Sequence, residues 1–255
     1  MSSLLLWNLL TVAFLHTAVW LVSLLKRDVS IVDLFWAVGF AVITCRTALL
    51  VQWTPLSGLL VAMVLIWALR LSGYLTWRNW GEPEDHRYGK MREYWGRRFP
   101  LVSLFTVFLL QALLTWIVAL PVQTSILQGG NLGVFATIGV LLWTIGLVFE
   151  AVGDWQLARF KADQANAGKV MDHGLWRYTR HPNYFGEFLV WWGIYVATLE
   201  AGFVWWTLIG PVLMSILLLK VSGVTLLEKS LQARKQGYDD YARRTSAFFP
   251  WLPKS

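Results

Sequence analysis

The chain alternates between long apolar runs and shorter polar stretches. Seven runs approach the roughly 20 residues that a helix needs to cross a bilayer, and none shows the ten-residue alternation of a membrane β-barrel strand. The runs cover residues 4–25, 29–51, 56–74, 101–122, 132–149, 184–199 and 203–219. This pattern predicts an all-α, polytopic membrane protein with seven transmembrane helices.

The basic residues predict how these helices are oriented. Of the 22 Lys and Arg residues, only Arg46 and Arg70 lie inside a predicted span, and the others fall in the segments of one side. Basic loops stay in the cytoplasm, so we expect the N-terminus outside and the C-terminus in the cytoplasm. The first run lacks the basic start and small-residue cleavage site of a signal peptide, and we expect it to be retained in a bacterial inner (cytoplasmic) membrane.

Composition excludes several classes of protein. The chain is 56% hydrophobic and 15% charged, whereas soluble domains run near a quarter charged and disordered chains are poor in apolar residues. The net charge is +7, but a nucleic-acid site needs basic residues spread over a soluble face, and this apolar chain offers no such face. A single Cys excludes a disulfide framework, and the four scattered His give no metal-ligand spacing. We therefore expect no metal and no nucleic acid.

Ionisable residues inside or at the ends of the spans are the strongest functional signal. Such groups are costly in hydrocarbon and usually line a polar interior. They are Asp33, Arg46, Arg70, Glu150, Asp154, Glu187 and Lys220. All but Arg46 lie toward the cytoplasmic ends, which predicts one polar cavity open to the cytoplasm. Pairwise ion pairs and snorkelling are the alternative.

The spacing of these groups fits a nucleotide ligand. Glu150 and Asp154 are four residues apart and share a helix face, as do Asn183 and Glu187. Carboxylates and Asn bind ribose hydroxyls and amides, and nearby Arg and Lys bind phosphates. Because the sequence has no glycine-rich nucleotide loop, side chains of a helical bundle would have to hold the ligand.

Two stretches carry a family resemblance. Residues Gly174–Glu187 read GLWRYTRHPNYFGE, and Tyr238–Trp251 read YDDYARRTSAFFPW. With the spacing from Asp154 to these stretches, they resemble the C-terminal domain of the steroid 5α-reductase family, in particular its short bacterial members. The resemblance covers about residues 148–253. It implies a single integral-membrane domain, in which residues 1–122 form four substrate-side helices and residues 123–255 bind the cofactor.

The family resemblance implies an NADPH-dependent membrane oxidoreductase. Hydride would pass to the C=C bond of an α,β-unsaturated ketone of a lipophilic substrate from the bilayer, with a 3-oxo-4-ene steroid as the substrate class. No obligate protein partner is evident; membrane lipids are the other expected partners. The cofactor-binding residues implied are Arg70, Tyr74, Asp154, Lys161, Lys169, Tyr178, Arg180, Asn183, Glu187, Trp191, Glu228 and Tyr241.

The same resemblance implies an acid pair at the substrate ketone. The family uses a glutamate in the second span, where this chain has Asp33, and a tyrosine in the third span, where it has Trp67. A desolvated Asp33 is expected to stay protonated and to bond the carbonyl oxygen, while Trp67 can donate one N–H. Tyr74 is the third catalytic candidate, and Tyr184 is another residue for the tyrosine's role.

A methyltransferase is the alternative function. The HPNYxGE string also occurs in membrane methyltransferases that use S-adenosylmethionine to modify isoprenylcysteine or phospholipids. Those enzymes often carry a Glu-Glu pair before the tyrosine-rich tail, where this chain has Leu227-Glu228, which favours the reductase. A transporter is disfavoured because inverted repeats are absent, and a purely structural scaffold is disfavoured by the cost of its part-buried charges.

Overall fold

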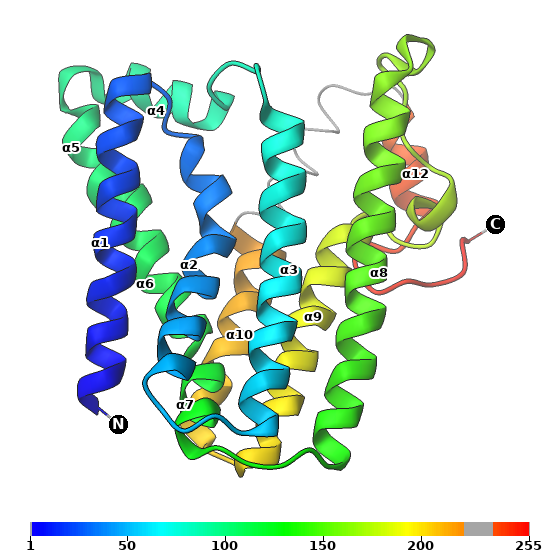
Figure 1. Ribbon diagram of the computed structural model, residues 1–255. Helices are drawn as coiled ribbons and strands as arrows, with labels where there is room; N and C mark the ends of the chain where they lie inside the picture. The colour runs from blue at the N-terminus through cyan, green and yellow to red at the C-terminus, as the bar shows by residue number, and fades with distance from the viewer. Residues whose placement is uncertain (1, 222–236, 255) are drawn as a thin grey trace. The chain divides into compact units, whose positions relative to one another are not determined.

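The structure is a computed structural model that describes residues 2–221 and 237–254. Within these ranges the chain is helical, and its extended pairing is limited to a bridge between Thr179 and Ser246. The predicted all-α class is therefore confirmed for the described residues. Figure 1 labels the main helices, and the chain divides into two compact units, which are Met1–Val134 with Thr198–Gly210 and Phe135–Ala197 with Pro211–Ser255.

The first unit is built around α2 (Ile31–Leu49). This helix packs against α1 (Ser2–Lys26), α3 (Pro55–Asn79), α6 (Leu110–Val118) and α7 (Leu120–Gln128). Shorter elements complete the unit, namely α4 (His86–Trp95), η1 (Gly96–Arg98), α5 (Phe99–Ser103), the π-helical η2 (Leu104–Leu109), η5 (Leu199–Ala201) and η6 (Trp205–Leu208).

Local sequence signals set helix ends in this unit. The Thr54 side chain accepts a hydrogen bond from the Ser57 N–H at 3.2 Å and caps α3, whose first residue is Pro55. Pro121 similarly lies in the first turn of α7, where its missing N–H costs no helical bond. The fourth apolar run, predicted as one helix over residues 101–122, is therefore divided at Ala119 between α6 and α7.

A polar network explains why Arg46 is tolerated within a predicted span. The Asn8 amide donates hydrogen bonds of 2.8 Å to both Thr47 Oγ1 and Gln123 Oε1. The Arg46 guanidinium donates to the Asn8 oxygen. Polar groups in hydrocarbon must be satisfied by other protein groups, so this network holds α1, α2 and α7 together while it accommodates the charge.

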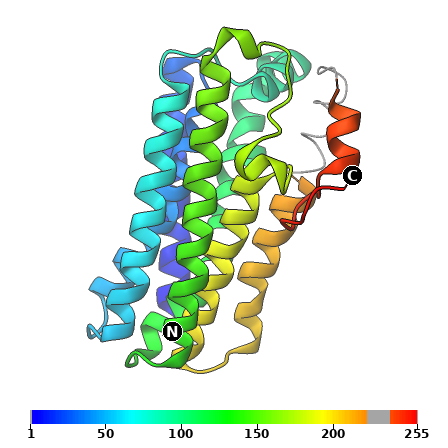
Figure 2. The same ribbon diagram turned by 90° about the vertical axis from the view of Figure 1, so that its right-hand side faces the viewer.

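The second unit depends on the close contact of α8 (Val134–Ala162) and α9 (Pro182–Thr198), which lie side by side in Figure 2. Gly139 and Gly146 on α8 meet Gly186 and Gly193 on α9. A Cβ atom added at Gly146 would lie 2.6 Å from the Gly186 carbonyl oxygen, and one at Gly193 would lie 2.5 Å from the Trp143 nitrogen. Only glycine lets two backbones approach so closely. We call these four glycines the glycine seam.

The other elements of the second unit are short. They are η3 (Gln164–Asn166), η4 (Gly174–Arg177), α10 (Ile209–Ile216), the π-helical η7 (Leu217–Val221) and α12 (Tyr238–Arg244). α8 continues well past residue 149, where its apolar run ends, because Glu150 and Asp154 are buried within this unit.

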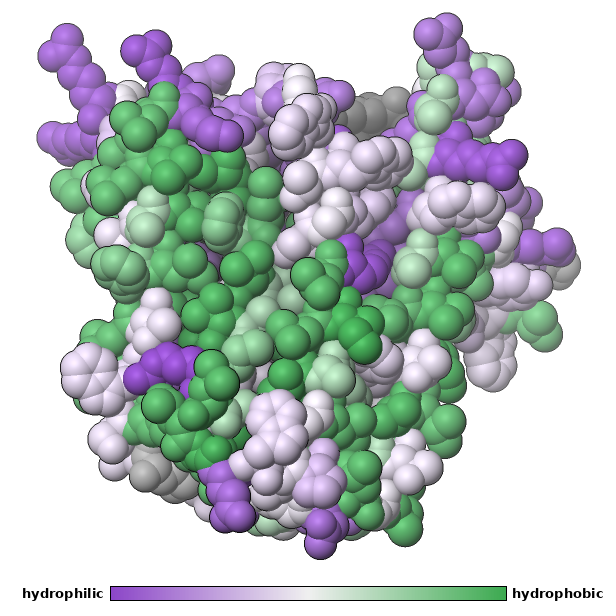
Figure 3. Space-filling view, in the orientation of Figure 1, coloured by the Kyte–Doolittle hydropathy of each residue, from purple (hydrophilic) through white to green (hydrophobic). Residues whose placement is uncertain are grey.

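The apolar helices indicate an integral membrane protein. Within residues 2–221 and 237–254, five helical segments are long and apolar enough to cross a membrane, and they are Ser2–Lys26, Ile31–Leu49, Pro55–Asn79, His86–Val118 and Val134–Ala162. The sixth and seventh predicted spans correspond to the 17-residue α9 and to the short apolar stretch Trp205–Lys220. Figure 3 shows hydrophobic side chains along α1, bordered by hydrophilic ones at its α4 end. The count of seven spans and the orientation of the termini stay predictions.

Candidate functional site

Asp33 is the centre of a polar cluster in the first unit. One of its carboxylate oxygens accepts a hydrogen bond from the Tyr88 hydroxyl at 2.9 Å, and the other accepts one from the Arg87 guanidinium, also at 2.9 Å. Tyr88 is buried, whereas the Asp33 side chain is 22% exposed. Gln111 of α6 also interacts with this carboxylate. We call Asp33, Arg87 and Tyr88 the Asp33 cluster.

The loop before α4 positions Arg87 and Tyr88 against the start of α2. The Asp85 carboxylate caps α4 by accepting from the Arg87 N–H at 2.9 Å, and the Asp85 N–H donates to the Ser30 hydroxyl at 3.2 Å. The Tyr88 ring then packs into a core cluster with side chains of α1, α2, α5 and η2, which are Val19, Val32, Phe99, Val107 and Phe108. An acidic cap followed by an inward-facing tyrosine thus brings a phenol to Asp33.

The charges of this loop are matched to their partners. Burial tends to raise the pKa of Glu84, but hydrogen bonds from Arg92 and the Val29 N–H, with the charge of Arg92, hold that pKa below its usual value. Burial also tends to raise the pKa of Asp85, and the hydrogen bonds and charge of Arg87 likewise bring it below its usual value. Both carboxylates therefore remain ionised at neutral pH and keep α4 docked.

Two catalytic candidates lie on α3: Trp67 in the packed interior, and Tyr74 next to basic residues. Trp67 is fully buried and packs edge-on against Phe40 of α2, with ring centroids 5.5 Å apart. Tyr74 lies between two cations, because the guanidinium carbons of Arg70 and Arg78 are 5.6 and 5.7 Å from its ring centroid. Arg70 and Tyr74, which are four residues apart, therefore share one helix face.

In the second unit, the structure brings together a carboxylate and an amide that the family resemblance implies at the cofactor. The Asn183 amide donates a 3.1 Å hydrogen bond to Asp154, whose side chain is buried. Gly153 makes this approach possible, since a Cβ atom there would lie 3.2 Å from the Asn183 nitrogen. Glu150 is also buried, at 2% exposure, while Glu187 on α9 is half-buried. This arrangement places acidic and amide groups along the α8–α9 contact.

The Trp176–His181 segment is held by the C-terminal tail. Thr179 donates to the Phe248 carbonyl at 2.7 Å, and the Arg180 guanidinium donates to the Ala242 and Thr245 carbonyls at 2.6 and 3.0 Å. The Tyr241 hydroxyl donates to the Trp176 carbonyl at 2.6 Å. Arg180 and Tyr241, expected at the cofactor, thus have clear structural contacts, and their cofactor roles stay predictions.

The remaining cofactor candidates have different surroundings. Lys161 and Lys169 are exposed, and Lys161 lines a 530 Å³ hollow at the end of α8 with Asp163, Gln164 and Asn166. Trp191 is buried on α9. Tyr178 is exposed and lines a separate apolar hollow of 360 Å³ beside Phe149 and the tail residues 250–252. Glu228 lies outside the described residues.

Sequence reasoning missed Arg87 and Tyr88. They belong to the charged stretch Gly81–Arg98, whose density of charge and aromatic residues is also typical of a solvated interfacial segment. The available signal was local: Asp85 is a helix-cap residue, and the tyrosine three positions later starts an amphipathic turn. That signal predicts a short helix but does not identify Asp33, which is 55 residues away, as the partner of Tyr88.

Comparisons with known proteins identify a family whose function is described as unknown. A family model described as a protein of unknown function, DUF1295, matches residues 19–245. An uncharacterized protein of Schizosaccharomyces pombe is 24% identical, over 97% of this chain and 80% of that protein. No solved structure matches the chain significantly.

Proposed function

The chain belongs to the DUF1295 family, and we propose that it is an NADPH-dependent membrane reductase. In this proposal it transfers hydride to the C=C bond of an α,β-unsaturated ketone in a lipophilic substrate, with a 3-oxo-4-ene steroid as the substrate class. The family includes steroid 5α-reductase-like proteins. The observation that carries the proposal is the hydrogen bond between the buried Tyr88 hydroxyl and Asp33.

The Asp33 cluster has the chemistry to polarise a ketone. Both oxygens of Asp33 accept hydrogen bonds, so the group that can turn to a substrate oxygen as donor is the Tyr88 hydroxyl. When the Tyr88 hydroxyl turns to the substrate, Arg87 continues to bind Asp33 and keeps its carboxylate oriented. A phenol aimed at a carbonyl oxygen in a water-poor site stabilises negative charge that develops there. The protonated Asp33 expected from the sequence stays an alternative donor.

The donor set of the second unit fits a dinucleotide. A carboxylate bonded to an amide, as in Asp154 and Asn183, suits ribose hydroxyls and a carboxamide. The exposed lysines at and beyond the end of α8, Lys161 and Lys169, suit phosphates. S-adenosylmethionine carries no phosphate, so it would give these lysines no group to bind. These groups would hold NADPH, which supplies hydride when bound.

The reaction adds one hydride and one proton across the C=C bond. Hydride adds to the β-carbon, the π electrons move toward the carbonyl oxygen, and the Tyr88 hydroxyl stabilises the resulting enolate. The α-carbon then takes a proton from water, and the carbonyl re-forms. Residues of the chain supply orientation and charge stabilisation, while the hydride comes from the cofactor.

Replacement of Tyr88 tests the substrate half of the proposal. We expect Tyr88→Phe to lower kcat for a 3-oxo-4-ene steroid about 10²- to 10³-fold, the usual cost of losing one oxyanion donor. Tyr94→Phe is the matched control, because Tyr94 lies on the same helix and is 81% exposed. Equal turnover of the Tyr88 variant and the parent would remove the Asp33 cluster from catalysis.

A binding titration tests the cofactor half. The purified full-length protein is titrated with NADPH, NADH and S-adenosylmethionine, and we expect saturable binding of NADPH that Asn183→Ala and Lys161→Gln weaken. Lys254→Gln is the control for Lys161, because Lys254 is an exposed lysine of the tail. Saturable S-adenosylmethionine binding without NADPH binding would replace the reductase by the methyltransferase.

We also propose seven spans with the N-terminus outside and the C-terminus in the cytoplasm of a bacterial inner membrane. The one-sided distribution of Lys and Arg supports this topology. Single cysteines introduced at residues 53 and 128 of a Cys45→Ser chain would test it when they are labelled by a membrane-impermeant reagent, in whole cells and after lysis. Labelling only after lysis would reverse the orientation.

A further inference from the structure

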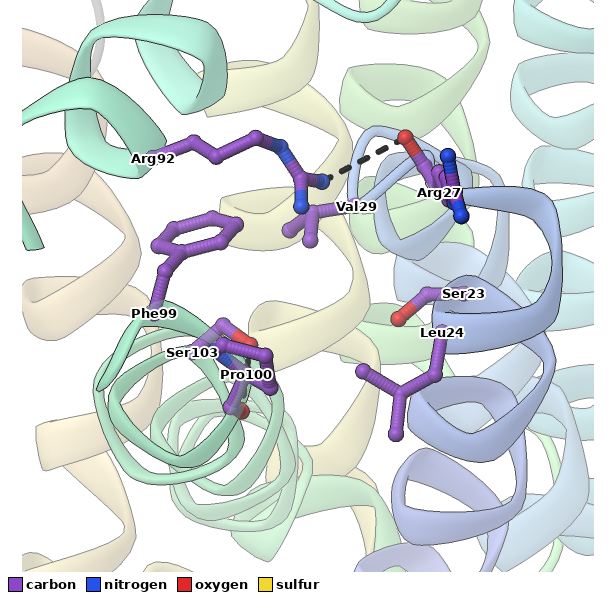
Figure 4. A pocket seen from close by; sticks show the side chains of 8 residues that line it. All are labelled: Ser23, Leu24, Arg27, Val29, Arg92, Phe99, Pro100 and Ser103. Carbon is purple, nitrogen blue, oxygen red and sulfur yellow. Dashed lines mark hydrogen bonds between the residues drawn. The ribbon is translucent and has the colours of Figure 1, made fainter. Parts of the chain in front are cut away.

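A cavity of 320 Å³ lies in the first unit between the end of α1 and the start of α5. Leu24, Val29, Phe99 and Pro100 form its apolar walls, and Ser23 and Ser103 contribute two hydroxyl groups. The guanidinium groups of Arg27 and Arg92 lie toward one end of the cavity, as Figure 4 shows. This volume is at the lower limit of the roughly 300–1,000 Å³ typical of small-molecule sites.

The two arginines differ in how they are bound. Arg92 donates to Glu84 at 2.7 and 3.0 Å and to the Arg27 carbonyl at 3.3 Å, and its cation lies 4.6 Å from the Phe99 ring centroid. In the described parts of the chain, no acidic side chain pairs with the Arg27 guanidinium. Glu84 forms an ion pair with Arg92, on which the nearby Asp28 charge also acts, so the Arg27 guanidinium is the cation at this cavity that is available to an anionic ligand.

The backbone of Arg27 is strained. Its φ is 54°, and it is the one non-glycine residue with a positive φ in the described ranges. A residue in this conformation just after a helix is usually Gly, because other side chains clash there. Arginine occupies a position that backbone energetics would give to glycine, and an outlier of this kind motivates a functional hypothesis for its side chain.

The length of α1 indicates that the cavity lies near the membrane interface. The 25 residues of α1 span about 37 Å at 1.5 Å per residue, which exceeds the roughly 30 Å hydrocarbon core. The Arg27 end of α1 therefore reaches the membrane interface. Leu21 and Leu25 on the same last turns are 53% and 87% exposed, and they offer an apolar surface to acyl chains.

We propose that this cavity binds one anionic phospholipid. The phosphate lies on Arg27, with Arg92 beside it, since guanidinium groups bind phosphate oxygens in bidentate fashion. The glycerol backbone occupies the cavity between Leu24 and Phe99, and the acyl chains continue along Leu21 and Leu25. A cavity of this volume is too small for a whole lipid, which is consistent with acyl chains that remain in the bilayer.

The test measures lipid binding to the purified full-length protein in a neutral detergent. Native mass spectrometry counts adducts with dioleoylphosphatidylglycerol, dioleoylphosphatidylcholine, oleate and inorganic phosphate. We expect phosphatidylglycerol to bind most tightly, and Arg27→Gln to weaken it about tenfold, as loss of one charge-assisted hydrogen-bond partner does. Lys26→Gln is the matched control, because this neighbouring exposed base does not line the cavity. It should leave binding unchanged.

A second variant tests the cavity itself. Leu24→Trp puts a larger side chain into the wall from a position that is 36% exposed, so that the fold is retained, and it should also weaken phosphatidylglycerol binding. Equal losses in the Arg27 and Lys26 variants would overturn the proposal, since they would indicate general surface attraction. Oleate or phosphate binding as tight as that of phosphatidylglycerol would also overturn it.

Discussion

The glycine seam gives a prediction that can be worked out atom by atom. In Gly146→Ala, the new methyl group would lie 2.6 Å from the Gly186 carbonyl oxygen, 2.6 Å from the Val190 nitrogen and 2.9 Å from the Leu189 Cβ. Two of these neighbours are backbone atoms of α9, which cannot rotate away. The two helices must therefore separate, and we expect a loss of stability.

The magnitude follows from overpacking. Forcing an extra methyl group into a packed contact costs typically about 1–3 kcal/mol, and rigid backbone neighbours place this site at the upper end. Alanine gains up to about 1 kcal/mol over glycine inside a helix, so the net loss is about 2 kcal/mol. At about 2–4 °C per kcal/mol for a chain of this size, Gly146→Ala should lower the melting temperature by roughly 4–8 °C.

Gly73→Ala is the control. Gly73 is also a helical glycine in an apolar helix, but a Cβ atom there meets nothing within 4 Å, so this variant should melt at the same temperature as the parent or higher. Both variants are followed by intrinsic fluorescence during heating in detergent. If Gly146→Ala is as stable as Gly73→Ala, the two helices are not in backbone contact, and the reasoning is refuted.

Three further predictions concern single residues outside the glycine seam. Because the pKa of Glu84 is below its usual value, its ionised form stabilises the fold at neutral pH, and this contribution is lost as pH falls through that lowered pKa; Glu84→Gln should make the melting temperature less dependent on pH in acid. Arg27→Gly should raise stability in lipid-free detergent by about 1 kcal/mol, because it relieves the left-handed backbone, and an unchanged or lower melting temperature would contradict this. Tyr241→Phe removes the hydrogen bond to the Trp176 carbonyl and should speed proteolysis of the 174–183 segment; equal cleavage rates would contradict it.

The hydrophobic pattern was sufficient to predict most helices. The runs at residues 4–25, 56–74 and 184–199 correspond to α1, α3 and α9 within a few residues at the N-terminal ends. The length of the apolar run determines the bounds of these helices, because each helix must bury one continuous apolar surface or expose it to lipid. The same pattern did not predict that α8 continues to Ala162, since packing against α9 lets that helix carry Glu150 and Asp154 beyond its apolar run.

Only part of the candidate site was identified from the sequence, because contacts between distant segments leave no local pattern. Asp154 and Asn183 were identified from their chemistry, and the structure joins them by a hydrogen bond. Tyr88 was not identified, because its partner Asp33 is distant in sequence and only the fold of the intervening loop brings the two together. Periodicity predicts which face of a helix is apolar; it carries no information on which loop closes over that face.

The tail contacts have a consequence for how the protein matures. The bonds from Thr179 to Phe248, from Arg180 to Ser246 and from Trp251 to Tyr178 join the 174–183 loop to residues that are synthesised well after it. The helices before residue 200 can enter the membrane during synthesis, but the 174–183 loop acquires these partners only once residues 246–251 have been synthesised. A chain that stops near residue 240 would therefore keep these helices but lack the hydrogen bonds that hold the 174–183 loop.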